Sequence, residues 1–319
     1  MKTCIALAAA FAVAGCAATS EDTTVFRTPE GALLDVDTSL AYKPGDVSDE
    51  QLASSTRELF VADFMNVFRR FDRSKTEEMV RFYTGALGLD SLAPVQLTSK
   101  QQMILTGVGQ GQIKLSAGLP EGRSYALGGV DGGTGIRYLA LRYPDEAALT
   151  ARFAQHGFNA PAFRDVGGGL RGAVSMDPGG FPVLLTIDPA ALPNGDSGVA
   201  IGINASDLEA SRAFYRSFVG LDELAPLADP LTGHTIYPFR NGETTIHLFH
   251  TGGTLPNDDG SAGIQYIVGD AAMVDAKAKH RAIPMQTPLN KLSGFDLTTI
   301  WLSDPDGVTN YFAQVGPKR

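Results

Sequence analysis

The stretch that decides the fold occurs twice in the chain: FYTGALGLDSLAPV at residues 82–95 and FYRSFVGLDELAPL at residues 214–227. Eight of the fourteen positions are identical, and the second copy begins 132 positions after the first. Two later motif pairs keep nearly the same spacing: GIRY at 135–138 with GIQY at 263–266, and DPGG at 177–180 with DPDG at 304–307. Three motifs at a nearly constant spacing indicate a duplicated domain.

Each copy alternates strand and helix patterns. Residues 64–71 predict a strand, and Ser74 with Glu77 three positions later predicts a helix that begins with a capping box. In the second copy, a strand at 199–205 is followed by the expected cap Ser206. The apolar stripe of the first helix consists of Met79, Phe82, Tyr83, Ala86 and Leu87. Further strands are predicted at 112–115, 137–143, 182–187, 245–249, 265–268 and 310–315, and further helices at 145–156 and 271–281. The sequence therefore predicts an α+β fold of four β-α-β-β-β units, arranged as two consecutive pairs.

The N-terminus has the pattern of an export signal. Lys2 precedes an apolar run at 5–14 that is too short to cross a hydrocarbon core of ~30 Å, so residues 1–15 predict a signal peptide. Val-Ala-Gly-Cys at 13–16 resembles the lipobox of bacterial lipoproteins, which implies that Cys16 is lipidated and anchors the chain at the periplasmic face of a membrane. By the same resemblance, Ala17 after the cysteine favours the outer membrane. Ordinary secretion with a coincidental cysteine is the alternative.

Two segments precede the repeated region. Residues 16–47 are polar without a sustained period, which predicts a tether. Ser48 with Gln51 three positions later predicts an accessory helix within residues 48–60, placed against the first domain.

Composition excludes several classes of function. The only two cysteines are Cys4 and Cys16, so the folded region has no disulfide, thiolate nucleophile or zinc–sulfur site. The formal net charge is −9, and neither a Lys/Arg run nor interleaved aromatic and basic residues occur. Nucleic acid is therefore an unexpected partner, because binding to phosphates needs clustered cationic charge.

One known family shares these motifs. Ser-x7-Phe-Tyr-x4-Gly-Leu, beginning at Ser74 and again at Ser206, together with Asp-Pro-Asp-Gly at 304–307, resembles the vicinal oxygen chelate superfamily, which includes glyoxalase I, bleomycin-resistance proteins and extradiol dioxygenases. The resemblance implies two tandem domains, at residues 61–190 and 195–316. Each domain would be a pair of units that forms a half-open, eight-stranded cup around a pocket. The fold by itself does not imply a particular chemistry.

The resemblance also implies where a metal would be held. In the family, a His or Gln on the first strand of a unit and a Glu on its last strand bind a divalent ion. The matching positions are Phe68, Lys114, Tyr138 and Leu184 in the first domain, and Ala200, His247, Gln265 or Tyr266, and Tyr311 in the second. Neither set offers the converging oxygen and imidazole ligands that such an ion needs. We therefore expect no metal and no other cofactor, although a different register could restore a ligand.

The same positions predict a pocket without a metal. Tyr138, Tyr266 and Tyr311 offer phenol groups and aromatic faces that suit a planar or apolar molecule. In the first cup, Lys114 and Arg137 could hold a carboxylate. His247 and Gln265 are expected in the second cup. The alternative is that the tyrosines simply fill cups that are closed by packing.

These expectations favour a membrane-anchored, monomeric protein that binds a small aromatic or apolar molecule. One alternative is a lyase or isomerase of glyoxalase type, with or without a metal, in which His247 is the general base or sole imidazole ligand and Tyr311 or Tyr266 polarises a carbonyl. Extradiol dioxygenase activity is disfavoured because its two-His, one-Glu pattern is missing. The remaining alternative is a scaffold that presents the tandem cups to a protein partner.

Overall fold

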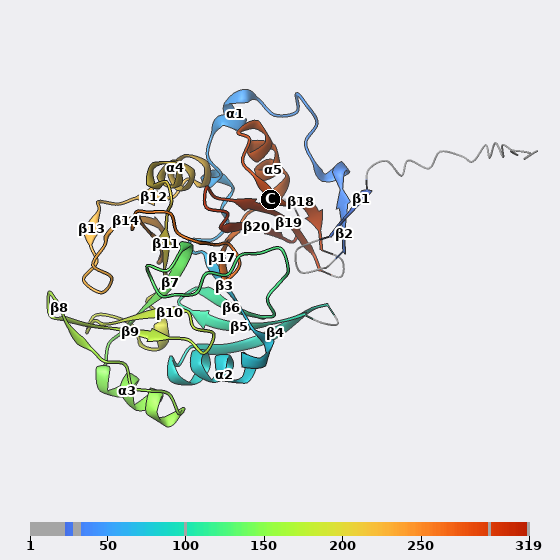
Figure 1. Cartoon of the computed structure of the whole chain (residues 1–319). Helices are drawn as coiled ribbons and strands as arrows, with labels where there is room; N and C mark the ends of the chain where they lie inside the picture. The colour runs from blue at the N-terminus through green and yellow to red at the C-terminus, as the bar shows by residue number, and fades with distance from the viewer. Residues whose placement is uncertain (1–22, 28–32, 99–100, 293–294, 318–319) are drawn as a thin grey trace, which may run out of the picture.

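Two curved sheets form the body of the computed structural model, which describes residues 23–27, 33–98, 101–292 and 295–317 (Figure 1). The predicted signal peptide and Cys16 lie outside the described residues. One sheet has the strand order β18-β19-β20-β17-β3-β6-β5-β4, and the main path of the other is β12-β14-β15-β11-β7-β10-β9-β8. Each main path thus contains eight strands, as predicted for two cups. In the described part of the chain, no helix is both long and apolar enough to span a membrane.

Four β-α-β-β-β units supply these strands. The first contains β3 (Asn66–Phe71), α2 (Thr76–Val80), β4 (Asp90–Thr98), β5 (Gln101–Val108) and β6 (Gly111–Ala117). The second contains β7 (Thr134–Tyr143), α3 (Glu146–Gln155), β8 (Arg164–Gly167), β9 (Leu170–Met176) and β10 (Pro182–Ile187). The third contains β11 (Ala200–Asn204), α4 (Leu208–Ala213), β12 (Asp222–Glu223), β14 (Thr235–Asn241) and β15 (Thr244–Phe249). The fourth contains β17 (Ala262–Ile267), α5 (Ala271–His280), β18 (Met285–Lys291), β19 (Leu297–Ser303) and β20 (Thr309–Val315). Two short strands lie off these main paths: β13 (Leu227–Ala228) pairs with β14, and β16 (Asn257–Asp258) pairs with β7.

The units pair differently from the prediction. Strand β3 of the first unit pairs antiparallel with β17 of the fourth, and β7 of the second unit pairs antiparallel with β11 of the third. The expected cups within residues 61–190 and 195–316 are therefore wrong in their composition, although each cup does consist of two units. The repeat predicts how many units exist, but any two first strands can join through the same antiparallel hydrogen bonds, so it does not predict which units pair.

The helices begin one or two residues away from the predicted caps. Asp207, not Ser206, caps α4 by accepting a hydrogen bond from the Ala210 amide at 3.0 Å. In the first unit, Asp72 accepts from the Ser74 amide at 2.8 Å and opens a short 3-10 turn before α2. A carboxylate at a helix start both accepts a hydrogen bond and interacts favourably with the helix dipole. This explains why Asp207 and Asp72, and not the neighbouring serines, are the caps.

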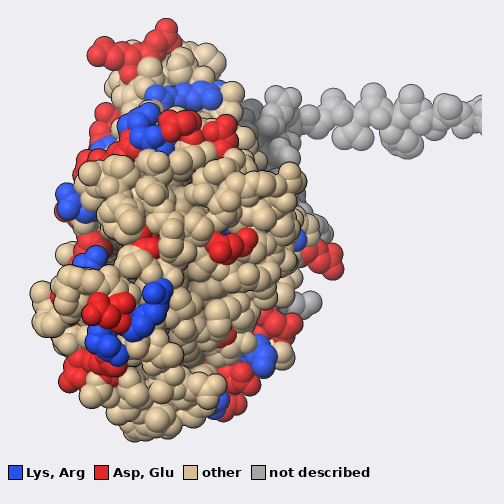
Figure 2. Space-filling view, turned by 60° about the vertical axis from the view of Figure 1, so that its left-hand side comes forward, with Lys and Arg blue, Asp and Glu red and all other residues tan. Residues whose placement is uncertain are grey.

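One continuous apolar core lies between the helices and the sheets. It contains helix residues such as Phe82, Phe153 and Phe214 together with alternate residues of the central strands, such as Val67 and Ile113. The intervening strand residues face the opposite, concave side of each sheet. On the face seen in Figure 2, acidic and basic side chains lie mainly toward the edges, and the broad middle is mostly uncharged with a few acidic groups.

The N-terminal arm, residues 33–64, lies on the second half of the chain. β2 (Leu33–Asp37) pairs with β1 (Thr23–Arg27) and lies beside β18, so part of the predicted tether has regular structure. The predicted capping box of Ser48 and Gln51 is present, but α1 (Asp49–Ala53) ends well before residue 60 and packs against α5, not against the first unit.

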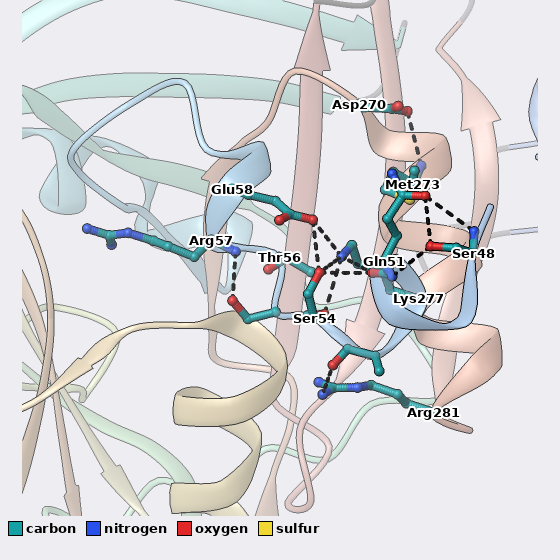
Figure 3. Close-up of polar contacts among 12 residues, drawn as sticks. Ser48, Gln51, Ser54, Thr56, Arg57, Glu58, Asp270, Met273, Lys277 and Arg281 are labelled. Atoms are coloured by element: carbon teal, nitrogen blue, oxygen red, sulfur yellow. Dashed lines mark hydrogen bonds and ion pairs between the residues drawn. The ribbon is translucent and has the colours of Figure 1, made fainter.

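A fully buried lysine of α5 holds this arm (Figure 3). The Lys277 ammonium donates to the Gln51 and Ser54 carbonyls, to the Ser54 hydroxyl at 2.6 Å and to the Glu58 carboxylate at 2.8 Å. A buried ammonium needs such a complete set of acceptors. The arm therefore completes the fourth unit, which is why it does not lie against the first.

Candidate functional site

The Lys114 cup is the concave side of the sheet formed by the first and fourth units. On β6, Ile113 and Leu115 pack into the core, so Lys114 between them faces the cup. On β20, Phe312 packs into the core and the neighbouring Tyr311 faces the cup by the same alternation. Both side chains are half-buried, which leaves part of each accessible from the cup.

Lys114 has a polar but uncharged environment. Its Nζ donates to Gln265 Oε1 at 2.6 Å, and the same oxygen accepts a hydrogen bond from Asn66 Nδ2 at 2.9 Å. Among the described residues, no carboxylate forms an ion pair with this ammonium. Burial lowers the pKa of Lys114 to about 8. The side chain is therefore a cation at neutral pH that loses its proton more readily than an ordinary lysine.

Aromatic side chains flank this polar group. Tyr311 lies opposite Gln265 in the β17–β20 register, and its ring meets the Trp301 ring edge-on with the centroids 5.2 Å apart. Phe68 lies opposite both Lys114 and Gly263, and a Cβ atom at Gly263 would collide with its ring. The cup thus combines one cation, two amides and three aromatic rings, a set that suits an aromatic molecule with an anionic group.

The His247 cup, on the concave side of the other sheet, has a more apolar interior. Tyr138 Oη lies 3.3 Å from His247 Nδ1, and the Tyr138 ring stacks on Phe249 with the centroids 5.9 Å apart. Tyr138, Leu184, Ile236 and Phe249 form a buried cluster of their own. Burial lowers the pKa of His247 to about 4, so its imidazole is neutral at physiological pH.

Both cups share one packing device. Gly202 on β11 lies opposite Tyr138, and a Cβ atom there would collide with the Tyr138 ring, as one at Gly263 would with Phe68. In each cup an aromatic ring of one first strand thus lies over a glycine of the partner strand. Only glycine permits this close approach.

Comparison with known proteins agrees with this architecture. Residues 199–312 match the model of the Glyoxalase/Bleomycin resistance protein/Dioxygenase superfamily. Glyoxalase I from Zea mays has a similar structure, with a TM-score of 0.62 and 19% identity over 78% of this chain and 92% of that one. A provisionally named dioxygenase from Bacillus subtilis subsp. subtilis strain 168 has a TM-score of 0.58 and 13% identity over 79% of this chain and 84% of that one. Residues 199–312 thus match the vicinal oxygen chelate superfamily, and most of the chain has the same fold as these two structures. None of the curated proteins matches the chain.

The positions at which this superfamily holds a metal do not fit a metal in either cup. The Lys114 cup has Phe68, Lys114, Gln265 and Tyr311 there, and the His247 cup has Tyr138, Leu184, Ala200 and His247. In the described part of the chain, no three His, Cys, Asp or Glu side chains are grouped as a metal site. At these positions each cup therefore offers one neutral amide or imidazole, where a divalent ion needs several oxygen or nitrogen ligands.

The structure brings some of the predicted residues together and separates others. Lys114, Gln265 and Tyr311 share one cup. The sequence left open whether Gln265 or Tyr266 occupies the position on β17 that faces the cup, and the register places Gln265 there. His247 and Tyr138 share the other cup. His247 and Tyr311 therefore lie in different sheets, and the predicted catalytic pairing of the two in one cup is wrong.

Two predicted pocket residues have structural surroundings instead. Tyr266 packs into the core between Phe60 and Phe312, and its hydroxyl donates to Asn310 Oδ1 at 3.0 Å. Arg137 lies at a β-bulge of the other sheet, where its Nη1 is 3.5 Å from the Asp258 carboxylate and its Nη2 donates to the Gly129 carbonyl. The prediction that Arg137 joins Lys114 in one cup is wrong, because β7 belongs to the other sheet, where it pairs with β11.

Sequence reasoning missed two contributors to the Lys114 cup and an arginine at the same sheet. Asn66 and Trp301 lie on strands whose facing could not be assigned without the sheet register. Arg123, in the connection between β6 and β7, donates from Nη1 to Gln286 at 3.0 Å and to Thr309 on β20 at 3.2 Å. Its buried Nε and Nη2 atoms have no hydrogen-bond partner among the described residues. Loop residues carry no periodicity, so no sequence signal pointed to Arg123.

Proposed function

We propose that the Lys114 cup binds a small aromatic molecule with an anionic group, such as a carboxylate, without a metal. The observation that carries this proposal is the half-buried Lys114 ammonium, whose hydrogen-bond partner is the neutral amide of Gln265, opposite Tyr311 in the sheet. A partly desolvated cation without an ion pair gains more from an anionic ligand than a solvated one does. Arg123, which donates to Thr309 of the same sheet and has two nitrogens without a partner among the described residues, adds positive charge.

Thermal stabilisation of the full-length protein in detergent tests this proposal. Phenylacetate and benzoate are compared with their uncharged amides, so that only the charge of the ligand changes. We expect the acids, and not the amides, to raise the melting temperature, because a ligand that binds only the folded state stabilises it by RT ln(1 + [L]/Kd). Lys114→Met should abolish the effect, whereas the exposed Lys291→Met should not. Equal stabilisation by acids and amides, or an unchanged response in Lys114→Met, contradicts the proposal.

We propose further that the protein performs this binding at the periplasmic face of a membrane, anchored through lipid on Cys16. The support is the signal pattern of residues 1–15 and the Val-Ala-Gly-Cys motif. Expression of the full chain with a labelled fatty acid should label the wild type, and Cys16→Ala should remove both the label and membrane association. Equal labelling of the two proteins contradicts the anchor.

A glyoxalase-type reaction in the His247 cup is the second candidate, favoured by the contact between Tyr138 and His247. A general base is most effective when its pKa lies near the working pH, and the pKa of His247 is about 4. The neutral imidazole is thus a weak base at pH 7, and the binding function takes precedence. Methylglyoxal turnover that disappears in His247→Gln but persists in Lys114→Met would reverse this order.

A further inference from the structure

Lys114 differs from the fully buried Lys277 in what surrounds its amine. Lys277 donates to oxygens of three residues, including the Glu58 carboxylate, which stabilises its charged form. Lys114 donates to one amide oxygen and lies half-buried on the concave side of its sheet. Lys75 pairs with Glu78 at the surface, and the exposed Lys279 pairs with the buried Asp275.

This environment is the one that makes a lysine amine nucleophilic. An amine attacks a carbonyl carbon only in its neutral form, which desolvation favours and a neighbouring carboxylate would oppose. With a pKa of about 8, roughly half of Lys114 is neutral at pH 8, against less than about 1% of an ordinary lysine with a pKa near 10.4. A neutral amine that donates one hydrogen to Gln265 still has its lone pair for reaction.

We propose that Lys114 Nζ forms an imine with the carbonyl group of an aromatic aldehyde or ketone bound in the Lys114 cup, which rests on the proposed binding function. Nζ adds to the carbonyl carbon, and a proton moves from nitrogen to oxygen to give a carbinolamine. The C–O bond then breaks, water leaves, and the C=N bond forms. No oxidant or reductant takes part, and hydrolysis returns the free amine and the carbonyl compound.

The surroundings of Lys114 suit such a reaction. The Trp301 and Tyr311 rings lie along the same row of the sheet as Gln265 and offer aromatic faces to the ligand. Because Lys114 and Gln265 come from the first and fourth units, the reactive group and its hydrogen-bond partner meet only when those units pair. Neither half of the repeat contains this arrangement by itself.

Borohydride trapping tests the inference. The full-length protein in detergent is incubated at pH 8 with phenylpyruvate, reduced with sodium borohydride, digested and analysed by mass spectrometry. We expect the reduced secondary amine at Lys114 at more than about ten times the occupancy at exposed Lys291, since the neutral fractions differ by about a hundredfold. Lys114→Arg should lose the adduct and keep the melting temperature; Lys114→Gln serves the same purpose if the arginine variant is unstable.

Phenyllactate separates this inference from the proposed function, because it has the same ring and carboxylate but no ketone. If phenyllactate stabilises the wild type and phenylpyruvate labels Lys114 no more than Lys291, binding stands and imine formation is refuted. If neither compound stabilises the protein but Lys114 is labelled selectively, the amine is reactive and the proposed binding function fails. Equal labelling of all lysines without stabilisation refutes both.

Discussion

Asp304, in the turn before β20, should make the protein less stable as the pH rises. Its carboxylate is fully buried and accepts hydrogen bonds from the Tyr215 hydroxyl at 2.9 Å and from the amides of Asp306 and Val308. Burial first, and the neighbouring Asp306 second, raise the pKa of Asp304 from 3.8 to about 7. No Lys or Arg in the described part of the chain forms an ion pair with it.

The sign and size follow from proton linkage. Between pH 3.8 and about 7, folded Asp304 keeps its proton while the unfolded chain releases it, so the free energy of unfolding falls as the pH rises. Each pKa unit is worth about 1.4 kcal/mol, so the full interval corresponds to about 4 kcal/mol. This contribution is fully present at pH 3 to 4 and lost by about pH 8.

Asp304→Asn removes the titration and retains the shape. One amide oxygen can accept from the Asp306 and Val308 amides, and the amide nitrogen can face the Tyr215 hydroxyl. We expect wild type and variant to be similar near pH 4 and the variant to be more stable by about 4 kcal/mol at pH 8. Urea unfolding followed by fluorescence of the single tryptophan, Trp301, measures the difference at each pH. A difference that stays constant from pH 4 to 8 would refute the reasoning.

Asp177 provides the matched control, because it occupies the same turn in the first half of the repeat. It accepts from Arg69 Nε at 2.9 Å and from the Tyr83 hydroxyl at 3.2 Å, and both Arg69 and Asp177 are buried. Asp177→Asn leaves the Arg69 guanidinium without its counter-charge. We expect a loss of about 3–5 kcal/mol at neutral pH, the opposite sign to Asp304→Asn. A stabilised Asp177→Asn variant would show that the arginine does not distinguish the two sites.

Three further outcomes follow from the structure. The wild-type protein should gain about 3 kcal/mol of unfolding free energy as the pH rises from about 4 to 6.5, because the folded imidazole stays neutral while the unfolded one binds a proton. His247→Gln should lack this gain, and urea unfolding of both proteins at each pH measures the difference. This gain in stability opposes the loss caused by Asp304 over the same pH interval. The two effects therefore partly cancel in the wild-type protein, and each is measured as the difference between the wild type and its variant. Gly202→Ala should cost about 1–3 kcal/mol in the same assay, since the added methyl collides with the Tyr138 ring; an unchanged midpoint would contradict this packing. Lys277→Met should expose residues 48–60 to limited proteolysis, whereas Lys279→Met, whose ammonium is exposed, should leave the cleavage rate unchanged.

The sequence predicts the units of this fold better than it predicts their assembly. Apolar periodicity and the repeat locate the four units, since both depend on local geometry. The pairing of β3 with β17 depends on contacts about 200 residues apart, which no local pattern records. The same limit explains the site: the facing of Lys114 follows from alternation on one strand, but its contact with Gln265 follows from that pairing.

The two cups differ at the positions that decide whether ligand can enter. Both cups place an aromatic ring over a glycine where their two first strands pair, so this part is the same. The residues on the last strands of the units differ. In the His247 cup, Leu184 on β10 joins a buried apolar cluster, and an interior filled in this way gains stability from burial. In the Lys114 cup, Lys114 on β6, the last strand of the first unit, stays half-buried. Since a desolvated lysine costs stability unless it is paired, its presence on this concave face argues for a role in binding.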